Sequence, residues 1–189
     1  NWEGTQQGDV LGPLFFSLGL LLVQLRKRAI FVGADPNELF AHHLAPSSRE
    51  AAADAVHPLH ELCIFPEVSA EVMIRINERH AGLSVAGREA LAASLSAGFL
   101  DDLFAVHTDM DCLLVDDFTT RILMVDSLNL VVNSKSMVIT RGPVRPDHRE
   151  AFVGDIIDNT TPVAKRGVTY LGVPISDVDA FIEDCLGKK

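Results

Sequence analysis

The chain has 189 residues, and 48% of them are hydrophobic, which is more than a disordered segment carries and predicts a folded core. Its 26 acidic and 16 basic residues give a formal net charge of -10, which opposes long-range attraction to a phosphate backbone. Three widely spaced cysteines indicate neither a disulfide framework nor a CxxC metal site, so we expect an intracellular protein, with nucleus or cytoplasm left open.

The most apolar stretch, residues 11–25, predicts a long and mostly buried helix. Pro13 suits its first turn, and the basic residues 26–28 complement the dipole at its end. The stretch is interrupted by glycines and is shorter than the roughly 18 to 20 apolar residues of a membrane span, so we expect no membrane partner. Residues 29–33, Ala-Ile-Phe-Val-Gly, then predict a short strand.

Residues 97–106 place apolar side chains on both sides of Asp101 and Asp102. This pattern predicts two short buried strands joined by a tight acidic turn. Asp109 can cap a following helix that ends near residues 128–129, and residues 137–139 and 169–175 each predict a strand. The apolar positions of that helix at helical spacing are Leu113, Leu114, Phe118, Ile122 and Val125.

The two adjacent carboxylates are the first candidate site. Like charges a few ångströms apart disfavour one another's ionised form, and a divalent cation relieves this cost. Carboxylate oxygens suit Mg²⁺, which keeps several waters and completes its shell with substrate phosphates. An Asp-Asp pair by itself is usually a solvated turn, but two flanking apolar strands make a rigid mount for ligands.

A second candidate site is the polar, glycine-bearing loop of residues 4–12, Gly-Thr-Gln-Gln-Gly-Asp-Val-Leu-Gly, which runs into the apolar helix. Glycine lets the backbone approach a ligand closely, and glutamine offers both donors and acceptors. Taken alone, such a loop is more often structural than functional.

Four motifs in order resemble reverse transcriptases of the non-LTR retrotransposon kind. Residues 4–16 are similar to that family's Gly-x-x-Gln-Gly-Asp-x-Leu-(Ser/Gly)-Pro-Leu-Leu-Phe motif, and Phe99-Leu100-Asp101-Asp102 is similar to its aromatic-x-Asp-Asp box. Residues 128–136 resemble the Gly-Leu-x-Leu-Asn-x-x-Lys-(Ser/Thr) element, and residues 170–175 resemble the Tyr-Leu-Gly element that ends the palm. The four motifs cover most of the chain outside about residues 30–95.

The resemblance implies a role for each matching residue. Asp101 and Asp102 would be catalytic carboxylates that bind Mg²⁺ or Mn²⁺, and Gln7 and Gly8 would line the pocket for nucleotide and template. Lys135 would lie near the departing pyrophosphate, and Leu171 and Gly172 would support the primer end. For Lys135 a solvated surface lysine is an equal alternative, and for the Leu-Gly pair a packing role is the stronger one.

The fold implied is α+β, a ferredoxin-like palm (βαββαβ) that lacks its first strand, over a single partial domain of residues 1–189. Residues 30–95 are expected to form a partly helical, variable insertion. The family's first motif, a strand with another metal-binding Asp, has no counterpart here, so we expect this chain alone to be inactive and its unpaired sheet edge to favour self-association. The partners implied are an RNA or DNA template-primer and deoxynucleoside triphosphates. The alternative is a catalytically inert retroelement remnant with a structural or interaction role.

Overall fold

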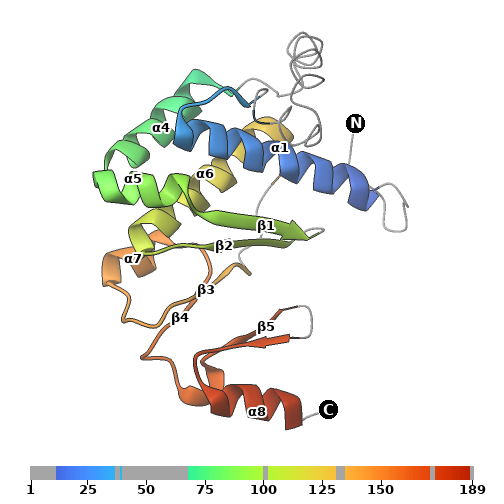
Figure 1. Ribbon diagram of the computed structural model, residues 1–189, viewed down its shortest axis with the longest axis vertical. Coiled ribbons are helices and arrows are strands. Elements are labelled where there is room, and N and C mark those ends of the chain that lie inside the picture. Colours follow the sequence, from blue (N-terminus) through green and yellow to red (C-terminus); the bar gives the residue numbers. More distant parts are fainter. Residues whose placement is uncertain are drawn as a thin grey trace. The chain divides into compact units, whose positions relative to one another are not determined.

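A computed structural model describes residues 12–36, 39, 68–99, 102–130, 135–170 and 173–187. The chain mixes helices and strands and divides into two compact units, residues 1–132 and residues 133–189 (Figure 1). The α+β class is therefore confirmed. The described strands form three two-stranded sheets, and the ferredoxin-like palm and the single domain stay predictions.

The first unit is built around two long helices. These are α1 (Gly12–Val32) and α6 (Met110–Leu128), and both contact the shorter α5 (Val85–Ala92), while α4 (Ala70–Ala81) packs on α6. An antiparallel hairpin of β1 (Leu95–Phe99) and β2 (Asp102–Val106) precedes α6. Side chains of α4 and α5 lie in the same buried clusters as those of α1 and α6, so the described part of residues 30–95 is helical and belongs to the core.

The predicted long helix is confirmed, but it continues through the residues expected to form a strand. Residues 29–32 are the last turn of α1, with Ala29 and Phe31 buried. The helix ends at Gly33, whose φ of +68° is left-handed, and the N–H of Ala34 donates to the carbonyl of Ala29 at 2.9 Å. The β-branched and aromatic residues favoured a strand locally, but the glycine cap and the burial of this turn override that preference.

The face of α6 that is buried differs from the expected one. Asp109 caps the helix through the N–H of Cys112 at 2.8 Å, and the helix ends at Asn129 with a φ of 52°, as predicted. However, Val125 is 50% exposed, and the predicted apolar positions of the helix lie beside the buried face. The buried residues are Cys112, Val115, Asp116, Thr119, Thr120, Leu123 and Met124. Of the buried polar residues, Asp116 and Thr120 are bound by Lys27 of α1, and the hydroxyl of Thr119 donates to the carbonyl of Val115 at 2.7 Å.

The second unit begins with a βαβ element. Strands β3 (Met137–Ile139) and β4 (Asp155–Ile157) pair in parallel and are connected through α7 (Pro146–Ala151). Gly154 precedes β4 with a φ of +146°, and a Cβ there would lie 2.1 Å from the carbonyl oxygen of Ser136. Only glycine fits this close backbone approach.

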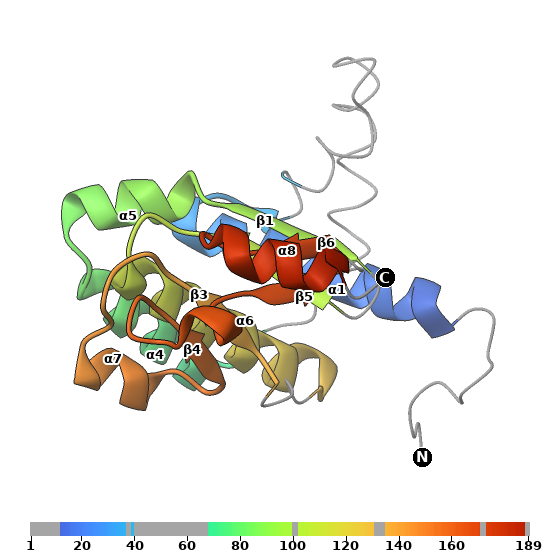
Figure 2. The ribbon, with the colours of Figure 1, turned by 90° about the horizontal axis from the view of Figure 1, so that it is seen from below.

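The single strand expected at residues 169–175 is two strands. β5 (Val168–Tyr170) and β6 (Val173–Ile175) are antiparallel, with Tyr170 opposite Val173. They follow a short 3₁₀ turn, Val163–Lys165, and α8 (Asp179–Gly187) lies along this hairpin (Figure 2). The Leu-Gly pair in the sequence therefore signals a break between strands, which is a usual meaning of glycine inside a strand pattern.

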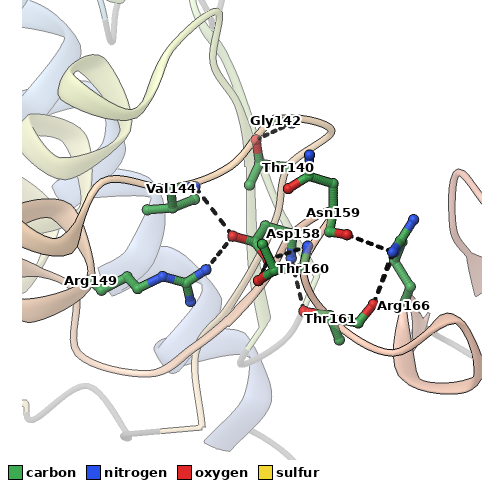
Figure 3. Close-up of polar contacts among 9 residues, drawn as sticks. All are labelled: Thr140, Gly142, Val144, Arg149, Asp158, Asn159, Thr160, Thr161 and Arg166. Carbon is green, nitrogen blue, oxygen red and sulfur yellow. Dashed lines mark hydrogen bonds and ion pairs between the residues drawn. The ribbon is translucent and has the colours of Figure 1, made fainter.

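Asp158 holds the loops of the second unit together (Figure 3). Its carboxylate is fully buried and accepts hydrogen bonds from the hydroxyl and N–H of Thr160 at 2.6 and 2.9 Å and from the N–H of Val144 at 3.2 Å. The guanidinium of Arg149 forms an ion pair with it. Burial by itself would raise the pKa of Asp158, but these hydrogen bonds and the charge of Arg149 lower it to about 2.

A pKa below the ordinary 3.8 means that ionised Asp158 stabilises the folded chain, by about 2 kcal/mol at neutral pH. This stabilisation is complete above about pH 4 and is lost as the pH falls toward about 2. We expect Asp158→Asn to lower the free energy of unfolding at pH 7 by about 2 to 3 kcal/mol and to weaken its dependence on acid pH. Urea unfolding at pH 7 and pH 3 measures both effects.

Asp155→Asn is the control, because Asp155 is exposed on the neighbouring strand. It should change neither quantity measurably. An acid response of the Asp158→Asn chain equal to that of the unsubstituted chain would contradict the assignment.

Candidate functional site

Asp101 and Asp102 fall where the chain passes from β1 to β2. Leu95 pairs with Val106 at the open end and Phe99 pairs with Asp102 at the closing end, so residues 100 and 101 connect the strands. The predicted pairing of two strands on either side of the acidic residues is thereby confirmed. Asp102 is the first residue of β2, whereas Asp101 lies outside the described residues.

The strand that follows the acidic pair is more exposed than the sequence predicted. Leu103, Phe104 and Val106 are 36%, 46% and 55% exposed. The expectation of two buried strands is therefore wrong for β2. Among the described residues β2 pairs only with β1, and a two-stranded ribbon offers too little apolar surface to cover both of its faces.

A buried polar network anchors the hairpin base. His107 directly follows β2, and its Nε2 lies 3.0 Å from Oδ2 of Asp116 on α6. The other oxygen, Oδ1, lies 2.6 Å from Nζ of Lys27 on α1, and Lys27 also donates to the hydroxyl of Thr120 at 3.2 Å. The side chains of His107, Lys27 and Asp116 are 2%, 6% and 6% exposed. One carboxylate thus joins α1, α6 and the end of the hairpin.

The charge on Asp116 is stabilised by its partners. Burial opposes ionisation of the carboxyl, but the hydrogen bond with His107 and the charge of Lys27 outweigh it, and the pKa of Asp116 is lowered. Sequence reasoning missed this network. Its signal is a run of polar residues, Asp116, Thr119 and Thr120, on one face of an apolar helix, together with a lysine inside the apolar α1 pattern.

Most of the other predicted site residues fall outside the part of the chain that the structure describes. These are Gln7, Gly8, Leu171 and Gly172. Lys135 is described: it is exposed, in a turn two residues before β3, and belongs to the second unit. Its proposed place near pyrophosphate stays a prediction.

Within the described ranges, no group of three or more His, Cys, Asp or Glu side chains could hold a metal ion. Of the helices that the structure describes, none combines the length and apolar character needed to cross a membrane.

The sequence matches no family model, no curated protein and no solved structure.

The network predicts a large stability difference between two neighbouring aspartates of α6. Removing Asp116 leaves Lys27 charged and buried without its partner, so Asp116→Ala should lower the free energy of unfolding by about 3 to 5 kcal/mol. Asp117 forms a partly exposed ion pair with Arg121 at 2.7 Å, and Asp117→Ala should cost less than about 1 kcal/mol. Urea unfolding followed by circular dichroism measures both.

A paired substitution separates charge from packing. Lys27→Met combined with Asp116→Leu replaces the ion pair by apolar side chains, and it should recover most of the stability lost with Asp116→Ala. Equal losses for Asp116→Ala and Asp117→Ala would show that the network does not hold this unit together.

Proposed function

We propose that this chain is part of the palm of an RNA-directed DNA polymerase, which adds deoxynucleotides to a primer 3′-hydroxyl by two-metal nucleotidyl transfer. The observation that carries the proposal is the hairpin: its register leaves residues 100–101 as the connection and begins β2 at Asp102. Tight mounting of adjacent carboxylates on a hairpin suits divalent-cation binding. The resemblance of the four motifs supplies the reaction class.

The surroundings of the hairpin support the same proposal. α1, which follows the Gln-Gly motif in the sequence, contacts β1, and α6 follows β2 through the anchor at His107. The element order from α1 to α6 is helix, hairpin and helix once α4 and α5 are set aside, which suits the αββα part of a ferredoxin-like palm. We propose this palm as the finer fold.

In the proposed reaction Asp101 and Asp102 hold Mg²⁺ or Mn²⁺, Gln7 and Gly8 line the nucleotide and template pocket, and Lys135 lies near pyrophosphate. Leu171 and Gly172 support the primer. Bound divalent ions would supply Lewis-acid chemistry that favours ionisation of the attacking 3′-hydroxyl and offsets the charge of the triphosphate and the leaving pyrophosphate. The partners are a template-primer and deoxynucleoside triphosphates.

A non-catalytic role is the second candidate. It is favoured by the net charge of -10 and by the exposed apolar side chains of β2, which suit contact with another chain. Self-association through this strand belongs to that proposal.

Metal binding tests the site directly. We expect Mn²⁺ to bind with a Kd in the millimolar range, because two carboxylates without phosphates make a poor cage for a strongly hydrated ion. Asp101→Asn should weaken this binding, whereas Glu183→Gln, which removes one charge from an exposed position on α8, should not. Isothermal titration of the three chains gives the result, and micromolar binding or equal binding by all three would place the metal elsewhere.

Primer extension tests the reaction. Two-metal transfer tolerates little displacement of its ligands, and a shift of about 1 Å can cost about a hundredfold in rate. With two carboxylates at the turn, we expect residues 1–189 alone to give no synthesis above background on an RNA template. A longer polypeptide that supplies a third metal-binding Asp should extend the primer and lose that activity with Asp101→Ala. Strong synthesis by residues 1–189, or synthesis that survives loss of Asp101, would refute the proposal.

A further inference from the structure

Two arginines of α4 lie over one aromatic ring of α6. The Cζ atom of Arg79 is 4.5 Å from the centroid of the Phe118 ring, and that of Arg75 is 5.5 Å from it. The arginines are four residues apart and so leave the same face of α4, which packs on α6 (Figure 1). Cation–π contact with the ring restricts the motion of both guanidiniums. An exposed arginine without such a contact moves more freely.

These three residues and Glu78 line an open hollow of about 350 Å³. Arg75, Glu78 and Arg79 are exposed. Within the part of the chain that the structure describes, neither arginine has a carboxylate in an ion pair. Two guanidiniums thus face a hollow with their N–H groups available to a ligand.

Other arginines of the same unit are used differently. Arg121 is bound to Asp117 at 2.7 Å, and Arg88 donates to the carbonyl of Leu83 at 2.7 Å. In a chain with 26 acidic and 16 basic residues, carboxylates are plentiful. An arginine pair held on an aromatic ring and without such a partner therefore gives the hollow two positive charges against the one negative charge of Glu78.

We propose that Arg75 and Arg79 bind a phosphate group of a single-stranded nucleic acid. Guanidinium N–H groups form a planar fork that matches phosphate oxygens, and an arginine already stacked on a ring loses less freedom when it binds. The choice of nucleic acid as the source of the phosphate rests on the proposed function. The net charge of -10 on the whole chain opposes phosphate binding, whereas the two arginines attract phosphate locally.

Glu78 gives the site an internal test of sign. Its carboxylate lines the same hollow, so it repels an anion held by the arginines. Removal of this negative charge should strengthen phosphate binding, whereas removal of either arginine should weaken it. If Arg75, Glu78 and Arg79 bound no ligand, the substitutions would not have these opposite effects.

The experiment measures fluorescence anisotropy of a labelled single-stranded RNA of about ten nucleotides, in EDTA and at several salt concentrations. We expect Arg75→Gln and Arg79→Gln each to raise Kd about threefold, and the double variant to raise it about tenfold. The slope of log K against log salt should fall by about 0.7 when one phosphate contact is lost. Glu78→Gln should lower Kd.

Two further variants separate this site from general charge effects. Arg28→Gln removes the same charge from an exposed position on α1 and should leave Kd and slope near those of the unsubstituted chain. Phe118→Leu keeps all charges but removes the ring, and it should raise Kd. Thermal melts followed by circular dichroism confirm that each variant is folded. Binding by the double variant equal to that of Arg28→Gln would overturn the proposal.

Competition identifies the ligand. Inorganic phosphate at millimolar concentration should displace the RNA from the unsubstituted chain but have less effect on the double variant. Tighter binding of an acidic peptide than of RNA through the same arginines would overturn the nucleic-acid assignment. Failure of primer extension by the longer polypeptide, with the arginine dependence of RNA binding intact in EDTA, refutes the polymerase and leaves the site, whereas extension by the longer polypeptide without that arginine dependence refutes the site alone.

Discussion

The ion pair between Lys27 and Asp116 constrains the packing of the first unit. A buried charge is costly unless its partner is present, so the packing of α1 on α6 is restricted to arrangements that bring these two residues together. Apolar clusters lie on either side of the pair. Leu20 and Val23 of α1 pack in the cluster that contains Leu123 and Met124, whereas Phe31 packs in the cluster that contains Cys112 and Val115. The residue numbers rise on one helix as they fall on the other, which fixes an antiparallel register around one charged contact.

The position of the β1–β2 hairpin depends on the same ion pair. His107 binds the second oxygen of Asp116, so the base of β2 is joined to the carboxylate that orients α1 against α6. The apolar side chains of β2 above this base are exposed, and the strand begins at Asp102, at the other end. The base of the hairpin is therefore joined to α1 and α6 through one buried carboxylate.

The sequence was informative where the determinant is local. Asp109 and Asn129 mark the two ends of α6, and the apolar residues around Asp101 and Asp102 predicted the hairpin. Helix caps and turns can be predicted in this way because they depend on a few neighbouring residues. It failed where a distant partner decides. Asp116 and Thr120 look like the solvated side of a helix until Lys27, on another helix, makes them a buried face. Residues 29–32 look like a strand until Leu91 and Val115, on other helices, bury Phe31 in the last turn of α1. Neither partner can be read from spacing within one element.

The same distinction explains why the arginine pair was not found from the sequence. Arg75 and Arg79 alternate with Glu71 and Glu78 along α4. Such mixed charge patterns usually mark a solvated helix face. Phe118 was expected to belong to the apolar stripe of α6. Because the buried face of α6 is rotated toward Asp116, Phe118 lies at the margin of the core, where the arginines of α4 can cover its ring. The burial of Asp116 and the position of Phe118 at the margin of the core are thus two consequences of one orientation of α6.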